Sequence, residues 1–129
     1  MKRKLKQQGN AVRWFEIYVQ NMNRAKRFYE AVFLRKLQKL NSPSLEMWAF
    51  PMALDQMGTG GALVRMKGFQ SGGNSTLVYF ACEDCAEEAA RAVKNGGEIE
   101  KPKMSIGEYG FIALVYDTEG NMIGLHSLK

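Results

Sequence analysis

The sequence predicts an α+β fold in which a β-α-β-β-β module occurs twice in tandem. A strand followed by an amphipathic helix spans residues 14–33, and the same order returns over residues 75–97. Three strand candidates then follow each helix, at 36–41, 45–50 and 61–67 and at 98–104, 110–117 and 122–128. The predicted organisation is a basic tail at 1–10 and one domain at 11–129, made of a module at 11–67, an uncharged Gly/Ser-rich linker at 68–75 and a module at 76–129.

The first strand alternates between two sets of side chains, which predicts two different faces. One set is apolar and consists of Phe15, Ile17 and Val19, and the other is Trp14, Glu16 and Tyr18. We expect a helix capped by Asn23 to follow, with its apolar stripe at Ala25, Phe28, Tyr29, Val32 and Phe33. The apolar face of the strand should meet this helix, which leaves the mixed face to line a cavity.

The second unit repeats this pattern. Its strand is predicted from Thr76 to Cys82, its helix is capped by Asp84, and Gly96 ends the helix. The predicted apolar stripe is Ala86, Ala89, Ala90 and Val93. Matching Val19 to Cys82, and Gly61 to Gly124, gives the same offset of 63 residues, which indicates an internal duplication. By this offset Leu77, Tyr79 and Ala81 belong to the cavity face.

The net charge of +5 comes largely from one end of the chain. Lys2, Arg3, Lys4 and Lys6 supply four of these charges, and the rest of the chain has 14 basic and 13 acidic residues. A solvated tail is expected, although a nucleic-acid or membrane arm remains the alternative. Polar residues follow the tail where a signal peptide would need an apolar segment, and no stretch of about 20 apolar residues occurs. We predict a cytoplasmic protein that binds neither nucleic acid nor membranes.

The two cysteines form a C-x-x-C pair, Cys82 and Cys85, which is typical of a redox centre or half of a zinc site. The alternation places Cys82 on a buried face, which argues against redox chemistry. A zinc site would have only His126 to add to the two thiols.

Two segments resemble the vicinal oxygen chelate superfamily, which includes glyoxalases, bleomycin-resistance proteins and extradiol dioxygenases. WFEIYVQNMNRAKRFYEAVF is similar to the family's strand followed by D-x-x-R-A-x-x-F-Y, and YDTEGNMIGLHS is similar to its D-P-x-G-N-x-I-x-L ending. Asn21 replaces the Asp and Thr118 replaces the Pro, and both changes suit a turn. The resemblance covers nearly all of residues 12–128 and implies a glyoxalase-like fold.

The resemblance also locates the family's four metal ligands. They fall on Trp14, Gly61, Leu77 and Gly124, and none of these can bind a metal through its side chain. The chain has a single histidine, so a shift in alignment does not restore the His and Glu ligands of the metal-dependent members. We expect no cofactor, and a divalent metal is disfavoured unless ligation is Glu-rich or shared across a dimer.

Three functions stay open, because the same fold serves several of them. The first is binding of a small molecule in a pocket lined by Trp14, Tyr18, Leu77, Tyr79 and Gly124. The second is an enzyme, either with Glu16 and His126 as metal-free acid–base catalysts or as a divergent metal-dependent lyase or dioxygenase. The third is a regulatory module that binds its partner through MKRKLK.

Members of the resembled family often form their cavities from the first module of one subunit and the second module of another. Residues 11–67 hold 9 basic and 4 acidic side chains, whereas residues 76–129 hold 5 basic and 9 acidic ones. Opposite modules should therefore attract, and we predict a homodimer whose association weakens with salt. The alternative is that these charges lie on solvated helix faces and have no role in association.

Overall fold

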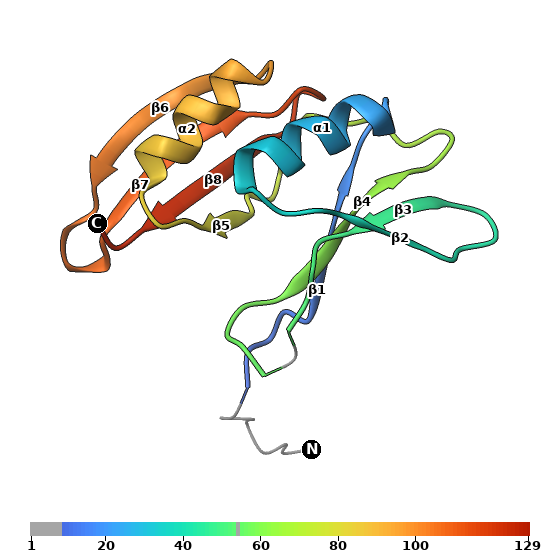
Figure 1. The fold of residues 1–129 in the computed structure, drawn as a ribbon, viewed down its shortest axis with the longest axis horizontal. Coiled ribbons are helices and arrows are strands. Elements are labelled where there is room, and N and C mark those ends of the chain that lie inside the picture. Colours follow the sequence, from blue (N-terminus) through green and yellow to red (C-terminus); the bar gives the residue numbers. More distant parts are fainter. Residues whose placement is uncertain (1–8, 54) are drawn as a thin grey trace, which may run out of the picture.

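The computed structural model describes residues 9–53 and 55–129, so the basic residues of the predicted tail lie outside the described part. The elements in order are β1 (Trp14–Tyr18), α1 (Met22–Phe33), β2 (Gln38–Leu40), β3 (Glu46–Ala49), β4 (Gly60–Arg65), β5 (Tyr79–Ala81), α2 (Cys85–Lys94), β6 (Glu98–Ser105), the short 3₁₀ helix η1 (Gly107–Tyr109), β7 (Phe111–Tyr116) and β8 (Met122–Ser127). The α+β fold with a repeated β-α-β-β-β order is thus confirmed (Figure 1).

Each module forms its own four-stranded mixed sheet. The strand orders are β1-β4-β3-β2 and β5-β8-β7-β6, and in both sheets the first pair is parallel and the other pairs are antiparallel. The two helices lie next to each other on one side of the sheets (Figure 1). Arg91 of α2 donates from Nε to the carbonyl oxygen of Val32 in α1 at 2.8 Å, which ties the helices together.

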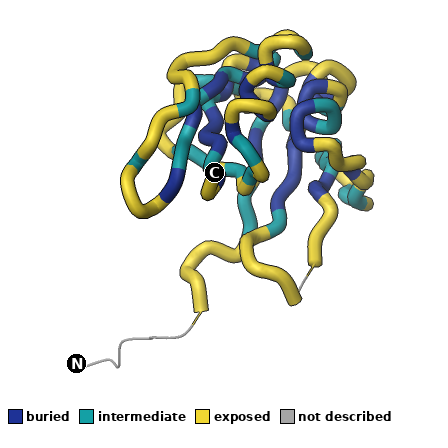
Figure 2. Tube along the Cα trace, turned by 60° about the vertical axis from the view of Figure 1, so that its left-hand side comes forward, coloured by how far each residue is buried: buried dark blue, intermediate teal, exposed yellow. Residues whose placement is uncertain are grey.

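One core is shared by the two modules, and an aromatic cluster forms its centre. Phe80 of β5 lies 4.3 Å from Phe33, 5.5 Å from Phe50 and 5.9 Å from Phe15, measured between ring centroids. These three rings, and Tyr29 at 6.0 Å, all belong to the first module. Phe80 of the second module therefore packs within the core of the first. Figure 2 shows the buried segments lying side by side at this junction. Aromatic pairs at these separations stabilise beyond the area they bury.

The first helix has the predicted apolar stripe but begins earlier than predicted. All five stripe residues, Ala25, Phe28, Tyr29, Val32 and Phe33, are buried. The N-cap is Asn21 and not Asn23, because Asn21 is extended and its side chain accepts from the backbone N–H of Arg24 at 3.0 Å. This earlier start places Met22 in the core, at 4 % exposure.

The second helix has the predicted ends and a different buried face. Asp84 caps it, and Gly96 (φ +98°) and Gly97 donate to the carbonyl oxygens of Val93 and Ala92, as in a Schellman motif. The predicted stripe is wrong except for Ala89: Ala86, Ala90 and Val93 are exposed. The buried residues are Cys85, Glu88, Ala89 and Ala92. Small alanines allow either face to be buried, and contact with α1 and the sheet decides between them.

The second module's first strand is shorter than predicted, since β5 covers only Tyr79–Ala81 and leaves Leu77 in the preceding segment. Residues 66–78 contain neither helix nor strand. At the far edge of the same sheet, β6 holds Pro102 where the register with β7 shifts between Lys101 and Met104. Proline has no N–H to donate, so an edge strand with an irregular register tolerates it.

Candidate ligand-binding face

Strand β1 separates the two predicted sets of side chains. Phe15, Ile17 and Val19 belong to the core with α1, while Trp14 and Tyr18 join a second cluster on the opposite face of the sheet. We call this opposite face, which points away from α1, the outer face of the first sheet. Successive residues of a strand point to opposite sides, so Glu16 lies on the outer face between Trp14 and Tyr18.

Glu16 is held by both of these neighbours. Trp14 donates from Nε1 to Oε2 of Glu16 at 3.1 Å, and the Tyr18 hydroxyl donates to Oε1 at 2.9 Å. The hydrogen bond to Glu16 is the main cause that raises the pKa of Tyr18, followed by burial and by the charge of the carboxylate. Among the described residues, no Lys, Arg or His lies within ion-pair distance of Glu16. We call Trp14, Glu16 and Tyr18 the Glu16 cluster.

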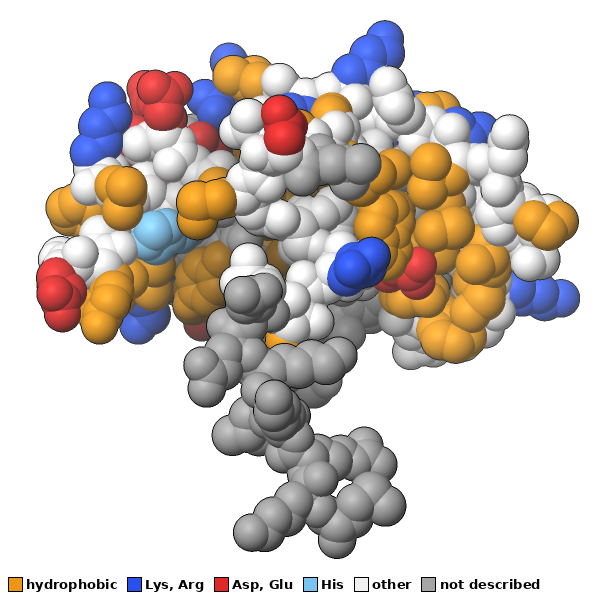
Figure 3. All heavy atoms as spheres, turned by 90° about the horizontal axis from the view of Figure 1, so that it is seen from below, with side chains coloured by type: hydrophobic (Ala, Val, Ile, Leu, Met, Phe, Trp, Pro, Cys, Tyr) orange, Lys and Arg blue, Asp and Glu red, His pale blue; other side chains and the backbone are white. Residues whose placement is uncertain are grey.

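The surroundings of the Glu16 cluster are apolar. The residues directly opposite on β4 are Gly60 for Trp14, Ala62 for Glu16 and Val64 for Tyr18. Ala62, Val64 and Ala49 are buried, and the hydrophobic side chains packed over them are only partly buried: Trp14, Tyr18, Leu40, Leu45 and Met47. Figure 3 shows hydrophobic side chains gathered on this side, with acidic atoms among them and a basic side chain at the edge of the patch. A carboxylate thus lies within an apolar patch.

One end of the outer face is closed by the segment between the modules. The Phe69 ring stacks on the Tyr18 ring with centroids 5.1 Å apart, and Gln20 donates from Nε2 to the Phe69 carbonyl at 2.9 Å. A hollow of about 500 Å³ lies here, lined by Val19, Gln20, Arg65, Met66, Lys67, Gly68, Phe69 and Gln70. A second hollow of about 360 Å³ is lined by Gly96, Glu98, Tyr116, Asp117 and Gly120. Neither hollow includes Glu16 or His126.

The second sheet holds the other predicted site residues. Tyr79 is half exposed, and its ring lies where a Cβ at Gly124 would be, so the two positions share one face. His126 has Ala81 opposite and bonds through Nε2 to the Tyr109 carbonyl oxygen at 2.7 Å. A carbonyl can only accept, so Nε2 of His126 carries the proton of this hydrogen bond.

The predicted site residues therefore form two groups. The Glu16 cluster is one group, and Tyr79 with Gly124 and His126 is the other. Within the described residues, no hydrogen bond or aromatic contact joins the groups, and Glu16 and His126 do not bond to each other. Their joint action as acid and base stays a prediction.

Sequence reasoning missed a buried polar junction between the modules. Glu119, in the turn between β7 and β8, accepts from the backbone N–H groups of Gln20 and Asn21 at 2.9 and 2.8 Å, and from Nε of Arg24 at 2.6 Å. Its carboxylate thus satisfies donors at the N-terminus of α1. Burial would raise the pKa of Glu119, but Arg24 and the backbone donors lower it to about 2.

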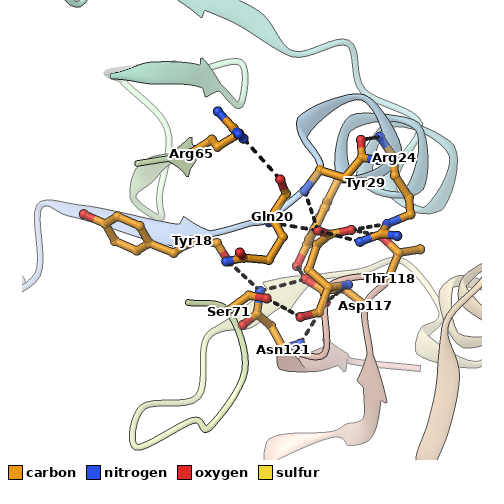
Figure 4. Close-up of polar contacts among 11 residues, drawn as sticks. Tyr18, Gln20, Arg24, Tyr29, Arg65, Ser71, Asp117, Thr118 and Asn121 are labelled. Atoms are coloured by element: carbon orange, nitrogen blue, oxygen red, sulfur yellow. Dashed lines mark hydrogen bonds and ion pairs between the residues drawn. The ribbon is translucent and has the colours of Figure 1, made fainter. Parts of the chain in front are cut away.

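Asp117 belongs to the same junction and lies close to Asn121, whose side-chain amide donates to it at 3.1 Å (Figure 4). It accepts from the Tyr29 hydroxyl at 2.6 Å and from the backbone N–H groups of Glu119 and Asn121 at 2.7 and 2.8 Å. Burial raises its pKa even though these hydrogen bonds act in the opposite direction. Asn121 donates onward to the Tyr18 carbonyl at 3.0 Å. The segment D-T-E-G-N was the available signal in the sequence, because four of its five residues have polar side chains. In the structure Asp117, Glu119 and Asn121 are buried.

Comparison with known proteins agrees with this architecture. The Glyoxalase/Bleomycin resistance protein/Dioxygenase superfamily matches residues 11–125, which is most of the 129 residues. The chain belongs to this superfamily. Among functionally curated proteins, none matches the sequence.

Several solved structures share the fold at low sequence identity. A hypothetical protein from S. aureus superposes with a TM-score of 0.70 at 14 % identity, covering 93 % of this chain and 95 % of that chain. A glyoxalase/bleomycin resistance protein from Albidiferax ferrireducens gives 0.64 at 20 % identity, covering 90 % and 98 %. Glyoxalase I from Zea mays gives 0.69 at 20 % identity, covering 89 % of this chain and 45 % of that chain. At these identities the likeness concerns the fold alone.

The superfamily's metal positions can now be placed on the sheets, and one of them needs correction. In the second sheet Tyr79 lies opposite Gly124. The residue equivalent to Tyr79 in the first sheet is Glu16, and it lies opposite Ala62. The offset is thus 63 residues for the first strands but 62 for the last strands. Gly61 faces Phe15 and the core, because the Phe15 ring occupies the place of a Cβ there. The equivalent of Gly124 is therefore Ala62, and using Gly61 as a landmark was wrong by one residue.

This correction does not supply a metal ligand. Ala62, like Trp14, Leu77 and Gly124, has no side-chain donor for a metal. Within residues 9–53 and 55–129, no three His, Cys, Asp or Glu side chains come together in a way that could hold a metal ion. The residues present therefore do not fit the superfamily's metal centre.

The C-x-x-C pair has no arrangement suited to redox chemistry. Cys82 and Cys85 are both free thiols, and Cys85 is fully buried. Burial, together with the charge of Glu88, raises the pKa of Cys82 to about 12. A thiol at that pKa forms almost no reactive thiolate at neutral pH.

Proposed function

We propose that this protein binds a small molecule on the outer face of the first sheet, without the superfamily's metal. The observation that carries the proposal is the Glu16 cluster. Its carboxylate is fixed by two aromatic donors and lies within an apolar patch. Binding sites typically combine apolar and aromatic walls with a few oriented polar groups. Tyr79, Gly124, Leu77 and His126 extend the proposed surface on the second module.

A homodimer is part of the proposal. A partly exposed aromatic face on a single chain is typical of an interaction surface. The first module carries an excess of basic residues and the second an excess of acidic ones. Pairing the first module of one subunit with the second module of another would cover the outer face and enclose the ligand. Sedimentation velocity at low and high salt checks this, and a salt-independent monomer would contradict it.

We place the protein in the cytoplasm. Its two thiols are unpaired, which fits a reducing compartment. No helix within the described residues has the length and apolar character needed to cross a bilayer. Fractionation of cells that express the full chain tests this assignment.

The two tryptophans allow a matched test of the binding face. Trp14 lies on the outer face, whereas Trp48 packs against the core with the Lys26 Nζ 3.3 Å from its ring centroid. Compounds from a fragment library that bind the proposed face should quench the fluorescence of the Trp48→Phe variant. They should leave the Trp14→Phe variant unaffected. Equal quenching in both variants would place the binding site elsewhere.

Metal content is tested separately on chelator-stripped protein exposed in turn to Ni²⁺, Zn²⁺, Mn²⁺ and Fe²⁺. After removal of excess metal, elemental mass spectrometry should find close to no metal per subunit, because the four equivalent positions lack donors. About one metal per subunit would overturn the metal-free proposal and direct attention to lyase and dioxygenase assays.

A further inference from the structure

Within residues 9–53 and 55–129, no basic side chain forms an ion pair with the carboxylate of the Glu16 cluster. Each carboxylate oxygen accepts one neutral donor, the indole N–H of Trp14 or the hydroxyl of Tyr18. Three other carboxylates in the described part of the chain form ion pairs: Glu119 with Arg24, Asp84 with Lys103 and Glu88 with Arg91. Glu16 forms no such pair with a described residue and is exposed to solvent.

Glu46 is the closest parallel to Glu16 and shows what is unusual about it. Its Oε2 accepts from Nε1 of Trp48 at 3.3 Å, which is again a contact between residues two apart on one strand. Glu46, however, lies opposite Arg65 on β4, whereas Glu16 lies opposite Ala62. Both carboxylates thus accept from a tryptophan of their own strand, but only Glu46 has a basic residue directly opposite on β4. Arg65 nevertheless donates from Nε to the Gln20 carbonyl and not to Glu46.

A ligand that covers this patch also covers the Glu16 carboxylate and displaces water from it. A neutral apolar ligand would remove Glu16 from water without a partner, which is costly for a charged group. An anion would add repulsion. A cation attached to an apolar body would pair with the carboxylate and contact the aromatic rings of Trp14 and Tyr18, both of which attract cations. The charge and the apolar surface therefore favour the same class of ligand.

We propose that the ligand of this face is an organic cation, an amine or quaternary ammonium group carried on an apolar or aromatic body, with its charge at Glu16. This inference rests on the proposed small-molecule binding function and specifies its ligand class. Trp14 and Tyr18 fix the carboxylate in place and supply the surface against which the body of the ligand lies.

The test compares two probes of the same shape and different charge, (4-hydroxyphenyl)trimethylammonium and 4-tert-butylphenol, on the full chain. Binding is followed by NMR through the indole N–H of Trp14, which donates to Glu16, with the indole N–H of Trp48 as the internal reference. The cation should bind about tenfold more tightly than the neutral probe. In Glu16→Gln this preference should fall to about twofold or less, and in the matched control Glu46→Gln it should persist.

The possible outcomes separate this inference from the function on which it rests. Equal affinity for the two probes, or tighter binding of the neutral one, would overturn the cation inference and leave small-molecule binding intact. No change at Trp14 with either probe at millimolar concentration would overturn both. A lower sedimentation coefficient for Glu16→Gln would show that a basic side chain of a second copy occupies the carboxylate, and this too would overturn the ligand proposal.

Discussion

Glu119 and Glu16 are two hydrogen-bonded carboxylates in opposite situations. Glu119 is enclosed between the modules, where its oxygens accept hydrogen bonds from two backbone N–H groups, Thr118 and Arg24. Glu16 accepts two side-chain donors on an exposed face and has no cation within the described residues. A buried carboxylate that the protein itself fully satisfies holds the fold together, whereas an exposed one with unused capacity is available to a ligand.

The comparison predicts very different costs for the same substitution at the two positions. Glu119→Gln should lower the free energy of unfolding by about 3 kcal/mol. The amide has an N–H₂ group in place of the oxygen that accepts from Arg24 and Thr118, and it removes the charge that pairs with Arg24. Glu16→Gln should change it by less than about 0.5 kcal/mol. Urea denaturation of both variants measures the difference. Similar costs at the two positions would show that Glu16 is structural as well.

Acid should remove the contribution of Glu119 in a defined range of pH. Its pKa in the folded protein is about 2, below its ordinary value of 4.5. The stabilisation is therefore complete above about pH 4.5 and is lost as the pH falls toward 2. Asp117 acts with the opposite sign, since burial raises its pKa above 3.8 and its protonation favours the folded state. Denaturation at pH 7, 4 and 3 should show the stability gap between wild type and Glu119→Gln narrowing, and a constant gap would refute the assignment.

Tyr29, which donates to Asp117, and Tyr18, which donates to Glu16, provide a second matched pair of substitutions. Tyr29→Phe should cost about 1.5 kcal/mol, because it removes a fully buried donor and leaves Asp117 with one partner fewer. Tyr18→Phe should cost less than about 0.5 kcal/mol, since the Glu16 carboxylate can bond water instead. Thermal unfolding of the two variants compares them. Equal destabilisation would mean that the outer face is as tightly organised as the junction.

The smallest expected effect is on the titration of Tyr18. Its pKa lies above the ordinary 10.0 because its hydroxyl donates to Glu16, and burial and the nearby charge add to this. In Glu16→Gln the pKa of Tyr18 should move back toward 10.0. Ultraviolet difference spectra follow this change when the Tyr29→Phe protein is compared with the Glu16→Gln/Tyr29→Phe double variant. An unchanged pKa would mean that Tyr18 and Glu16 are not bonded in solution.

The strength of the patterns explains which elements could be predicted. Alternation over Trp14–Tyr18 and the large apolar residues of α1 allow only one buried face, so both were predicted correctly. The alanines of α2 are nearly interchangeable, so its buried face was predicted wrongly. The predicted match of Gly61 to Gly124 was wrong by one residue. A shift of one residue along a strand moves every side chain to the other face of the sheet, and the composition of the strand does not reveal it.

The sequence by itself determined the repeated β-α-β-β-β order, the two faces of β1 and the superfamily, because these follow from local periodicity and a nearly continuous motif match. Only the tertiary structure showed that Glu16 is bonded by Trp14 and Tyr18, that His126 bonds to Tyr109, and that Asp117 and Glu119 join the modules. The junction contacts link residues about 90 to 100 positions apart. Such pairings depend on how the modules pack and leave no periodic trace along the chain.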